Sequence, residues 1–235
     1  MEVGYNCWHG CHRKSEGCKN CYVHRRDDSI GKNADLVYKT RSFDMPIKKD
    51  RQGNYKYPSG TTFDMCFSSD FFIEEADEWR KDVMAMIKER SDCRFFCITK
   101  RPERILECIP DIGDYDNLAI YCTMENQKRF DERAPIYLNL PLKHKGIVIE
   151  PMLEEVDISY CLDKELEAVT VGGESGPNAR VINFDWVKKI RNECIKKGIR
   201  FYFHQTGANL IVDNKLYKIP RKHQFSQAKK AFNTE

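Results

Sequence analysis

Four cysteines crowd into a short stretch near the start of the 235-residue chain. Thiolates are soft ligands, and the two-residue spacer between Cys18 and Cys21 lets both sulfurs grip one metal centre. Gly10 and Gly17 each precede a cysteine, which suits a loop wrapped tightly around an inorganic core. The segment therefore predicts a metal or iron–sulfur site. Its four thiols are Cys7, Cys11, Cys18 and Cys21.

Two kinds of centre fit these thiols, and their spacing does not choose between them. Four thiolates would close a tetrahedral zinc site, which is structural. Three thiolates on a [4Fe–4S] cluster would leave one iron open to an exchangeable ligand, which is catalytic. Three functions follow: a cluster-dependent enzyme, a zinc-stapled nucleic-acid-binding module without catalysis, or a cluster protein that senses or transfers electrons.

The other seven cysteines are scattered, mostly in apolar strands or on helix faces. Buried cysteine behaves as a small hydrophobe, so we expect them in the core; they are Cys66, Cys93, Cys97, Cys108, Cys122, Cys161 and Cys194. The chain start lacks the apolar stretch of a signal peptide, and no apolar run approaches the ~18 residues of a membrane span. We therefore expect a cytoplasmic protein with no membrane partner, in which thiols stay reduced.

The elements that must position these thiols alternate between strands and helices. Apolar runs of strand length lie at 3–6, 61–67, 93–99, 117–123, 144–151, 166–173 and 199–205. Helical patterns lie between several of them, notably at 71–90 and 184–197. This alternation implies βαβ units and a parallel sheet. We predict an α/β fold: a closed or incomplete β/α (TIM-like) barrel, with a doubly wound open sheet as second choice.

We expect one domain over residues 1–235. Its first part, 1–30, would be the cluster-binding segment, and its last part, 207–235, a basic C-terminal extension. Two short apolar runs flank Asp213 and Asn214. This pair of turn residues predicts a terminal hairpin.

Polar residues follow the predicted strands. Working residues of β/α barrels lie at the C-terminal ends of strands. Those ends carry Ser68-Ser69-Asp70, Thr99-Lys100-Arg101, Thr123-Met124-Glu125-Asn126, Glu150-Pro151, Gly172-Gly173-Glu174 and His204-Gln205. The pattern favours a cofactor-lined mouth. The alternative is an ion-pair network that only stabilises the barrel.

Charge is unevenly distributed along a chain whose net charge is +3. Residues 1–58 carry 12 Lys and Arg against 7 Asp and Glu, and residues 171–235 carry 13 against 5. First and last strands are neighbours in a barrel, so the two basic ends would form one face. Such a face suits a nucleic acid or nucleotide, although a solvated lysine-rich surface gives the same counts.

The cysteine segment carries the pattern GC-x3-S-x-GC-x2-CY at residues 10–22. This pattern resembles the signature of the phage-associated three-cysteine-motif family, which is similar to radical SAM enzymes of the spore photoproduct lyase kind. The likeness continues in order along nearly the whole chain, through SSDFF (68–72), ITKRPER (98–104), MENQKR (124–129), IEPML (149–153), VGGESGPNAR (171–180) and FHQTG (203–207). Cys7 lies where that family usually lacks a cysteine, which implies a spare thiol.

The resemblance implies that Cys11, Cys18 and Cys21 hold a [4Fe–4S] cluster to which S-adenosylmethionine (SAM) binds. Reductive cleavage of SAM would give a 5′-deoxyadenosyl radical, which abstracts hydrogen from the substrate. The cofactor supplies this chemistry, and the protein positions it. The resemblance also implies that the protein is encoded by a phage and that it receives electrons from a donor of the flavodoxin or ferredoxin type. It leaves open whether the reaction is of lyase or transferase type.

The resemblance extends to roles at the strand ends. Lys100 and Ser69 would bind the carboxylate and amine of SAM, and the Gly172-Gly173-Glu174 segment would line the adenosine or substrate side. The other expected pocket residues are Asp70, Arg101, Glu125 and Glu150. Within this set we expect Lys100, Glu125, Glu150 and Glu174 to be catalytic, and Ser69, Asp70, Lys100, Gly172, Gly173 and Glu174 to bind the cofactor.

The ligand set gives the first prediction. Alanine at Cys11, Cys18 or Cys21 should abolish bound iron after anaerobic reconstitution, because a cluster held by three thiolates does not survive the loss of one. Cys7→Ala should keep it, and iron counts per chain measure the difference. Equal loss in the Cys7 variant would replace the three-thiolate site with a four-thiolate one.

Overall fold

The fold is described from a computed structural model, which covers residues 1–161 and 165–232. The chain divides into two compact units that alternate along the sequence. The first unit contains residues 1–13, 23–121 and 140–144, and the second contains 14–22, 122–139 and the chain from 145 onward. The single domain over 1–235, with its segments 1–30 and 207–235, stays a prediction.

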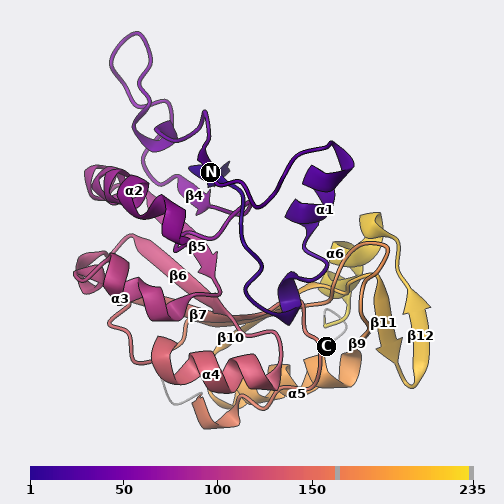
Figure 1. The fold of residues 1–235 in the computed structure, drawn as a ribbon. Coiled ribbons are helices and arrows are strands. Elements are labelled where there is room, and N and C mark those ends of the chain that lie inside the picture. Colours follow the sequence, from indigo (N-terminus) through magenta and orange to yellow (C-terminus); the bar gives the residue numbers. More distant parts are fainter. Residues whose placement is uncertain (162–164, 233–235) are drawn as a thin grey trace. The chain divides into compact units, whose positions relative to one another are not determined.

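Seven strands form the main sheet, in the order β1-β4-β5-β6-β7-β8-β10 (Figure 1). They are β1 (Glu2–Tyr5), β4 (Thr62–Met65), β5 (Arg94–Thr99), β6 (Leu118–Thr123), β7 (His144–Ile149), β8 (Ala168–Gly172) and β10 (Arg200–Gln205). The pairs β1–β4 and β4–β5 are parallel, as are β7–β8 and β8–β10. All seven predicted strands are confirmed, with ends shifted by one or two residues.

The sheet is open, so the closed form of the predicted barrel is wrong. Strands β1 and β10 stand at opposite ends of the strand order, and neither has a second neighbour within this sheet. A TIM barrel closes with eight strands, one more than this sheet contains. In the second unit, helix α6 (Arg221–Lys230) packs against β10. The fold is therefore α/β with an open parallel sheet.

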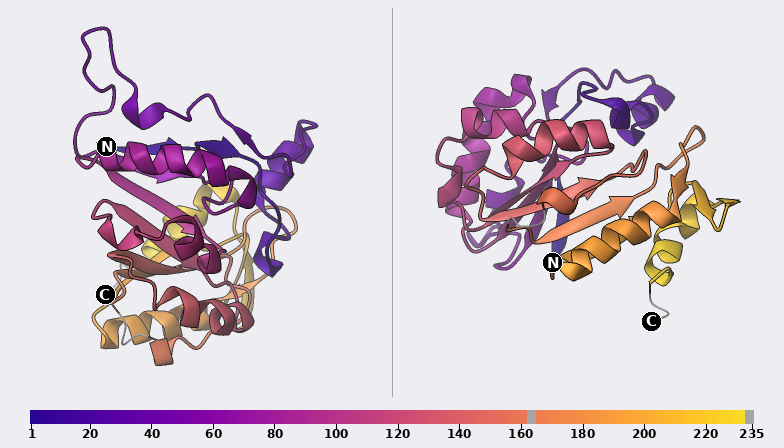
Figure 2. Two further views of the ribbon diagram at one scale, coloured as in Figure 1. Left: turned by 60° about the vertical axis from the view of Figure 1, so that its left-hand side comes forward. Right: turned by 90° about the horizontal axis from the view of Figure 1, so that it is seen from below.

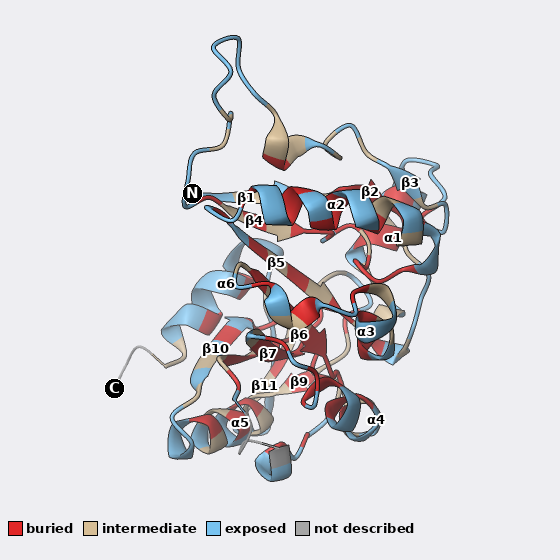
Figure 3. Cartoon of the chain, turned by 90° about the vertical axis from the view of Figure 1, so that its left-hand side faces the viewer, coloured by how far each residue is buried: buried red, intermediate tan, exposed pale blue. Residues whose placement is uncertain are grey.

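The first unit has an aromatic core covered by α2 (Asp77–Glu89). The rings of Phe63 and Phe95, on neighbouring strands, stack with centroids 5.1 Å apart. One face of α2 is buried and the other exposed (Figure 3). The helix begins at Asp77 rather than at the predicted Phe71. The carbonyls of Phe71 and Ile73 instead accept hydrogen bonds of 2.8 and 2.7 Å from the buried Arg80 guanidinium.

The helices α4 (Gln127–Tyr137) and α5 (Phe184–Lys196) belong to the second unit. Helix α5 begins at the predicted residue and ends one residue before the predicted end. Helices α5 and α6 both pack on β10 (Figure 2). The predicted hairpin is confirmed as β11 (Asn209–Val212) and β12 (Lys215–Lys218), which are antiparallel. Asp213 and Asn214 have φ of 49° and 61°, as a type I′ turn requires.

Several short elements were not predicted, because they are too short to show a period. They are β2 (Trp8–His9), α1 (Tyr22–Ser29), β3 (Tyr38–Lys39) and β9 (Ile182–Asn183), with 3-10 turns η1 (Glu16–Cys18), η2 (Met45–Ile47), η3 (Glu74–Ala76), η5 (Ile112–Asp114) and η6 (Ser159–Cys161). Pro102, by contrast, predicts a short helix through Ile109, and the structure has η4 (Pro102–Arg104) and α3 (Ile105–Cys108) there. Strand β9 pairs with β11, and β2 pairs with β3.

The scattered cysteines are mostly in the core, as predicted. Those that are buried are Cys66, Cys93, Cys97, Cys122 and Cys194. Cys108 is half-buried, and the side chain of Cys161 lies outside the described part of the structure. In that described part, no helix has both the length and the apolar character that crossing a bilayer requires.

Arg90 ties the irregular segment between β3 and β4 to the first unit. Its side chain is fully buried and donates to the carbonyls of Pro46 (2.5 Å) and Tyr57 (2.8 Å). Arg90→Met should therefore cost about 1–3 kcal/mol for each buried carbonyl left without a donor. Urea unfolding measures this loss, and limited proteolysis should find new cuts near Tyr57. The exposed Arg94→Met is the control, with a change below about 0.5 kcal/mol; equal stability of both variants would contradict the assignment.

Candidate functional site

In the first unit, the carboxylate of Asp70 joins the loops after β4 and β5. Its Oδ1 accepts hydrogen bonds from the Thr99 hydroxyl (2.8 Å) and the Phe72 amide (2.9 Å). Its Oδ2 accepts from the Lys100 amide (3.1 Å) and the Arg101 guanidinium (2.9 Å). Asp70 is 5% exposed, so these four donors replace the water it gives up. The predicted cofactor residue thus fixes the backbone that carries Lys100.

Arg101 links this junction to the cysteine segment within the same unit. Its second nitrogen donates to the His12 carbonyl at 3.2 Å. Burial would lower the pKa of Arg101, but the charges of Asp70 and of the Cys11 thiolate raise it overall. The Cys11 amide is itself held by the Ala34 carbonyl at 2.8 Å. A fixed guanidinium therefore stands beside Cys11.

Ser69 and Lys100, the residues expected to bind SAM, both belong to the first unit. The Ser69 hydroxyl donates to the Gly10 carbonyl, one residue before Cys11. The half-buried Lys100 has no ion pair for its ammonium among the described residues. The structure thus brings Ser69 to the cysteine segment and leaves the Lys100 ammonium available. SAM binding by either residue stays a prediction.

In the second unit, Glu125 anchors the loop that carries Cys18 and Cys21. Glu125 is fully buried and paired with Arg133 at 2.8 Å. It accepts hydrogen bonds from the Ser15 hydroxyl and from the Gly17 amide (3.1 Å). A Cβ atom on Gly17 would stand 2.8 Å from the Glu125 Oε1 atom, so only glycine fits there. Ser15 and Gly17, two of the non-cysteine residues of the sequence motif, therefore both contact Glu125.

Further contacts within the second unit hold the same loop. Asn20 donates to the Glu174 carboxylate at 2.9 Å, and Arg180 donates to Glu174 and to the Glu16 carbonyl. Burial would raise the pKa of Glu174, but the hydrogen bonds from Arg180 and Asn20 lower it overall. Hydrogen bonds from Arg129 lower the pKa of Glu16 to about 2. Glu174 thus joins the loop to the segment after β8.

These partners were missed by sequence reasoning. Glu125 and Glu174 were expected to be catalytic, and each instead has its carboxylate occupied by donors of the cysteine loop and of an arginine. Arg133 lies in α4, eight residues after Glu125, which is outside the i,i+3 and i,i+4 spacings by which a helical pair can be identified from sequence. Arg180 lies in the motif VGGESGPNAR, but the sequence does not indicate that it pairs with Glu174. A direct catalytic role for either glutamate stays a prediction.

Glu150, at the end of β7, reaches across β8 to β10. It accepts hydrogen bonds from His204 (2.8 Å) and from the Gln205 amide. A Cβ atom on Gly172 of β8 would collide with the Glu150 carboxylate. The absence of a side chain at Gly172 therefore leaves room for the side chain of Glu150. Gly173 similarly allows the Thr206 carbonyl to approach. The hydrogen bond that His204 donates to Glu150 raises the pKa of His204, whose side chain is half-exposed.

The motif cysteines differ from Cys7 in accessibility. Cys11, Cys18 and Cys21 are partly exposed, whereas Cys7 is fully buried with its sulfur 3.1 Å from that of Cys66. Cys11 belongs to the first unit, and Cys18 and Cys21 belong to the second. Within the described residues, no group of three His, Cys, Asp or Glu side chains is arranged to hold a metal ion. The three-thiolate site therefore stays a prediction.

The donor chemistry around Cys18 and Cys21 nevertheless fits an iron–sulfur centre. The Lys14 amide points at the Cys18 sulfur from 3.5 Å, and the Cys21 amide donates to the Cys18 carbonyl at 3.3 Å. Amide donors to sulfur stabilise thiolates and tune cluster potentials. Arg25, four residues after Cys21 in the sequence, has a buried Nε without an acceptor among the described residues. Such a donor fits an anionic group that the chain itself does not supply.

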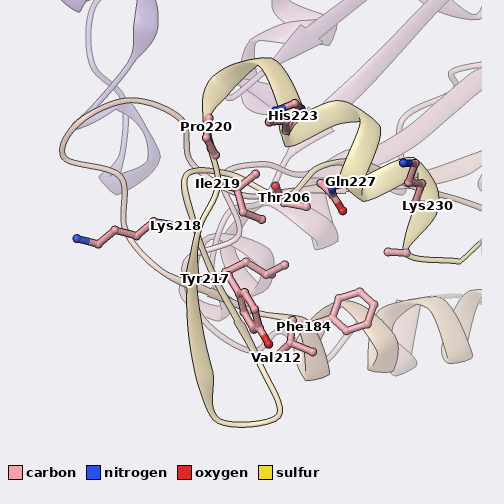
Figure 4. A pocket seen from close by; sticks show the side chains of 12 residues that line it. Phe184, Thr206, Val212, Tyr217, Lys218, Ile219, Pro220, His223, Gln227 and Lys230 are labelled. Atoms are coloured by element: carbon pink, nitrogen blue, oxygen red, sulfur yellow. The ribbon is translucent and has the colours of Figure 1, made fainter.

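A cavity of about 520 Å³ lies at the C-terminal end of the second unit. Figure 4 shows Phe184 of α5, Tyr217 of β12 and His223 of α6 around it. Lys218 and Lys230 also line it, so apolar walls are combined with positive charge. This combination suits an amphipathic anion such as a nucleotide.

The anchoring of the cysteine loop is tested at Ser15. Ser15→Ala leaves the buried Glu125 carboxylate one donor short and should destabilise the protein by about 1–3 kcal/mol. Amide hydrogen exchange in residues 14–22 should become faster. Ser226→Ala, on the exposed face of α6, should change stability by less than about 0.5 kcal/mol and leave that exchange unaltered. Unchanged exchange in the Ser15 variant would exclude Glu125 as the anchor.

The chain is similar to the solved structure of a cysteine-to-serine mutant of spore photoproduct lyase, with a TM-score of 0.52, 12% identity, and coverage of 84% of this chain and 75% of that one. At this identity the likeness shows the fold alone. No curated protein matches the sequence. A family model described as "Protein of unknown function (DUF5131)" matches residues 1–231, so the chain belongs to this family.

Proposed function

We propose that this protein is a radical SAM-type iron–sulfur enzyme. Cys11, Cys18 and Cys21 would hold a [4Fe–4S] cluster with SAM as its exchangeable ligand. When bound, the cluster and SAM together supply radical chemistry through reductive cleavage of SAM to a 5′-deoxyadenosyl radical. The identity of the substrate would determine whether the reaction is of lyase or transferase type.

The accessibility of the cysteines carries this proposal. The three thiols of the family-like motif are partly exposed, while Cys7 is fully buried against Cys66. A buried thiol with no path to solvent is a small hydrophobe, whereas accessible thiols beside cationic and amide donors become thiolate ligands. The division therefore supports a three-thiolate centre over a four-thiolate zinc site. The fold likeness to a spore photoproduct lyase agrees with it.

The residues of the first unit would bind the amino-acid end of SAM. Lys100 has an ammonium without an ion pair in the described residues, on a backbone that Asp70 fixes. An ammonium placed in this way would pair with the carboxylate of SAM. Ser69 would assist through its hydroxyl, and Arg101 would place a positive charge beside Cys11. Gly172, Gly173 and Glu174 would line the adenosine or substrate side.

In the second unit, Glu150 and His204 form the pair suited to moving a proton. The hydrogen bond to Glu150 raises the pKa of His204, so its protonated form persists to higher pH than in a free histidine, with Glu150 as the partner that would stabilise the charge. The group is half-exposed, so a substrate atom can reach it. Such an acid would serve a substrate that changes charge during the reaction.

The proposed substrate is a nucleic acid or nucleotide. The cavity at α6 joins apolar walls to lysines, and the adjoining hairpin and helix expose Lys215, Arg221 and Lys222. Positive charge next to an aromatic ring is typical of single-strand binding sites. We further propose an electron donor of the flavodoxin or ferredoxin type and a cytoplasmic location.

Anaerobic reconstitution with iron and sulfide tests the proposal. Four irons and four sulfides per chain, followed by release of 5′-deoxyadenosine from SAM on reduction, would support a [4Fe–4S] enzyme. Stoichiometric zinc in place of iron would support a zinc-stapled module. A cluster that leaves SAM intact would support electron transfer or sensing instead.

Lys100 gives a separate test of SAM binding. Truncating one partner of a desolvated charge pair costs about 2–5 kcal/mol, so Lys100→Met should weaken SAM binding tenfold or more with the cluster retained. Equilibrium dialysis with labelled SAM measures this affinity. The control is Lys81→Met, which removes an exposed lysine paired only with Glu78 in α2. Equal SAM affinity in the two variants would remove Lys100 from the site.

A further inference from the structure

The first unit contains a polar cavity of about 490 Å³ that has no part in the site described above. Its volume lies within the range of small-molecule sites. Three cationic side chains line it, those of Arg26, Lys39 and Arg41, together with the imidazole of His9. Within the described residues, no aspartate or glutamate contributes to the lining. The cavity therefore has the composition of an anion site.

The ribbon of β2 and β3 builds one wall of this cavity. His9 pairs with Tyr38 in the antiparallel register of the two strands, and their rings lie 5.5 Å apart. The Thr40 hydroxyl donates to the Asn6 carbonyl at 2.5 Å and accepts from the Ser42 amide at 3.0 Å. These bonds fix the turn that carries Arg41. The wall is thus formed before any ligand arrives, which lowers the entropic cost of binding.

His9 is held rigidly by a buried carboxylate. It is 8% exposed, and its Nε2 lies 2.5 Å from Oδ2 of Asp27, which is 1% exposed. Burial would raise the pKa of Asp27, but the hydrogen bond with His9 and the charge of Arg26 lower it overall. The ionised carboxylate fixes the orientation of the imidazole. A buried histidine locked in this way is a prepared hydrogen-bonding group rather than a solvated side chain.

The cations around His9 are only weakly engaged by the protein. Arg41 is exposed, and its guanidinium has no ion pair among the described residues. Arg26 approaches Asp27 only at 3.4 Å, and Lys39 approaches the exposed Asp82 only at 3.6 Å. The Lys39 pair is exposed and contributes little energy, and Arg26 has an exposed side chain at a long distance from the buried Asp27, so an incoming anion can compete for both cations.

We propose that this cavity binds the phosphate group of a nucleotide, either free or within a strand. Guanidinium groups match phosphate oxygens in geometry and charge, and two of them line the cavity. Tyr38, which is 39% exposed, offers a ring on which a base can stack. The inference does not rest on the proposed cluster chemistry, because no lining residue is a proposed ligand of the cluster or of SAM.

Calorimetric titration of the full-length protein tests this inference. The probes are inorganic phosphate, adenosine 5′-monophosphate and a short oligothymidylate. The monophosphate or the oligonucleotide should bind more tightly than inorganic phosphate, and the tighter of the two identifies a free nucleotide or a strand. Arg26→Gln and Arg41→Gln should each weaken that binding about tenfold, as expected for the loss of a charge-assisted hydrogen bond. Arg51→Gln, an exposed arginine outside the cavity, is the matched control and should not change it.

Three results would overturn the inference. The first is no detectable binding of either nucleotide probe. The second is unchanged affinity in the double variant of Arg26 and Arg41, which would place any nucleotide binding elsewhere, including the cavity at α6. The third is binding of inorganic phosphate as tight as that of both nucleotide probes, which would reduce the cavity to a simple anion site. The apoprotein suffices for every measurement, so failure of the cluster proposal would not affect the result.

Discussion

The buried carboxylate of Glu125 is the constraint on which the second unit's part of the cysteine motif depends. A fully buried charge is tolerated only when it is paired and fully hydrogen-bonded, and Arg133, Ser15 and Gly17 meet that requirement. Breaking such a pair from one side typically costs about 3–5 kcal/mol. Glu125 therefore fixes the loop at Ser15 and Gly17, and Cys18 and Cys21 come directly after these residues in the sequence. The six residues between Cys11 and Cys18 include the η1 turn that reaches Glu125.

Asp70 performs the same kind of work in the first unit. Its four donors come from Phe72 and from the Thr99–Arg101 segment after β5. Two carboxylates that the sequence placed in the pocket are thus occupied in holding the loops of their own units. Loop positioning of this kind is what makes a catalytic geometry precise. Under the proposed function, the groups left for chemistry would be Lys100, the three accessible thiols and His204.

Glycines at strand ends show how the backbone admits these contacts. Gly172 on β8 lets Glu150 of β7 reach His204 and Gln205 of β10, so one side chain spans three neighbouring strands. The segment Gly172-Gly173-Glu174 is expected from the sequence to line the adenosine or substrate side. The structure shows protein groups, Glu150 and the Thr206 carbonyl, at both positions. A role of this segment in lining the adenosine or substrate side stays a prediction.

The sequence by itself determined the α/β class, all seven strands of the main sheet, the terminal hairpin and the burial of most scattered cysteines. These features follow from local patterns: apolar runs of strand length, turn residues and the small apolar volume of cysteine. Only the tertiary structure decided that the sheet stays open, that Cys7 contacts Cys66, and that Glu125 and Asp70 hold loops. Hydrogen-bond partners such as Ser15 and Glu125 are 110 residues apart, and no local pattern records a contact at that separation. A carboxylate at a strand end looks the same in sequence whether it faces a cofactor or a buried arginine, because only packing decides which donors reach it.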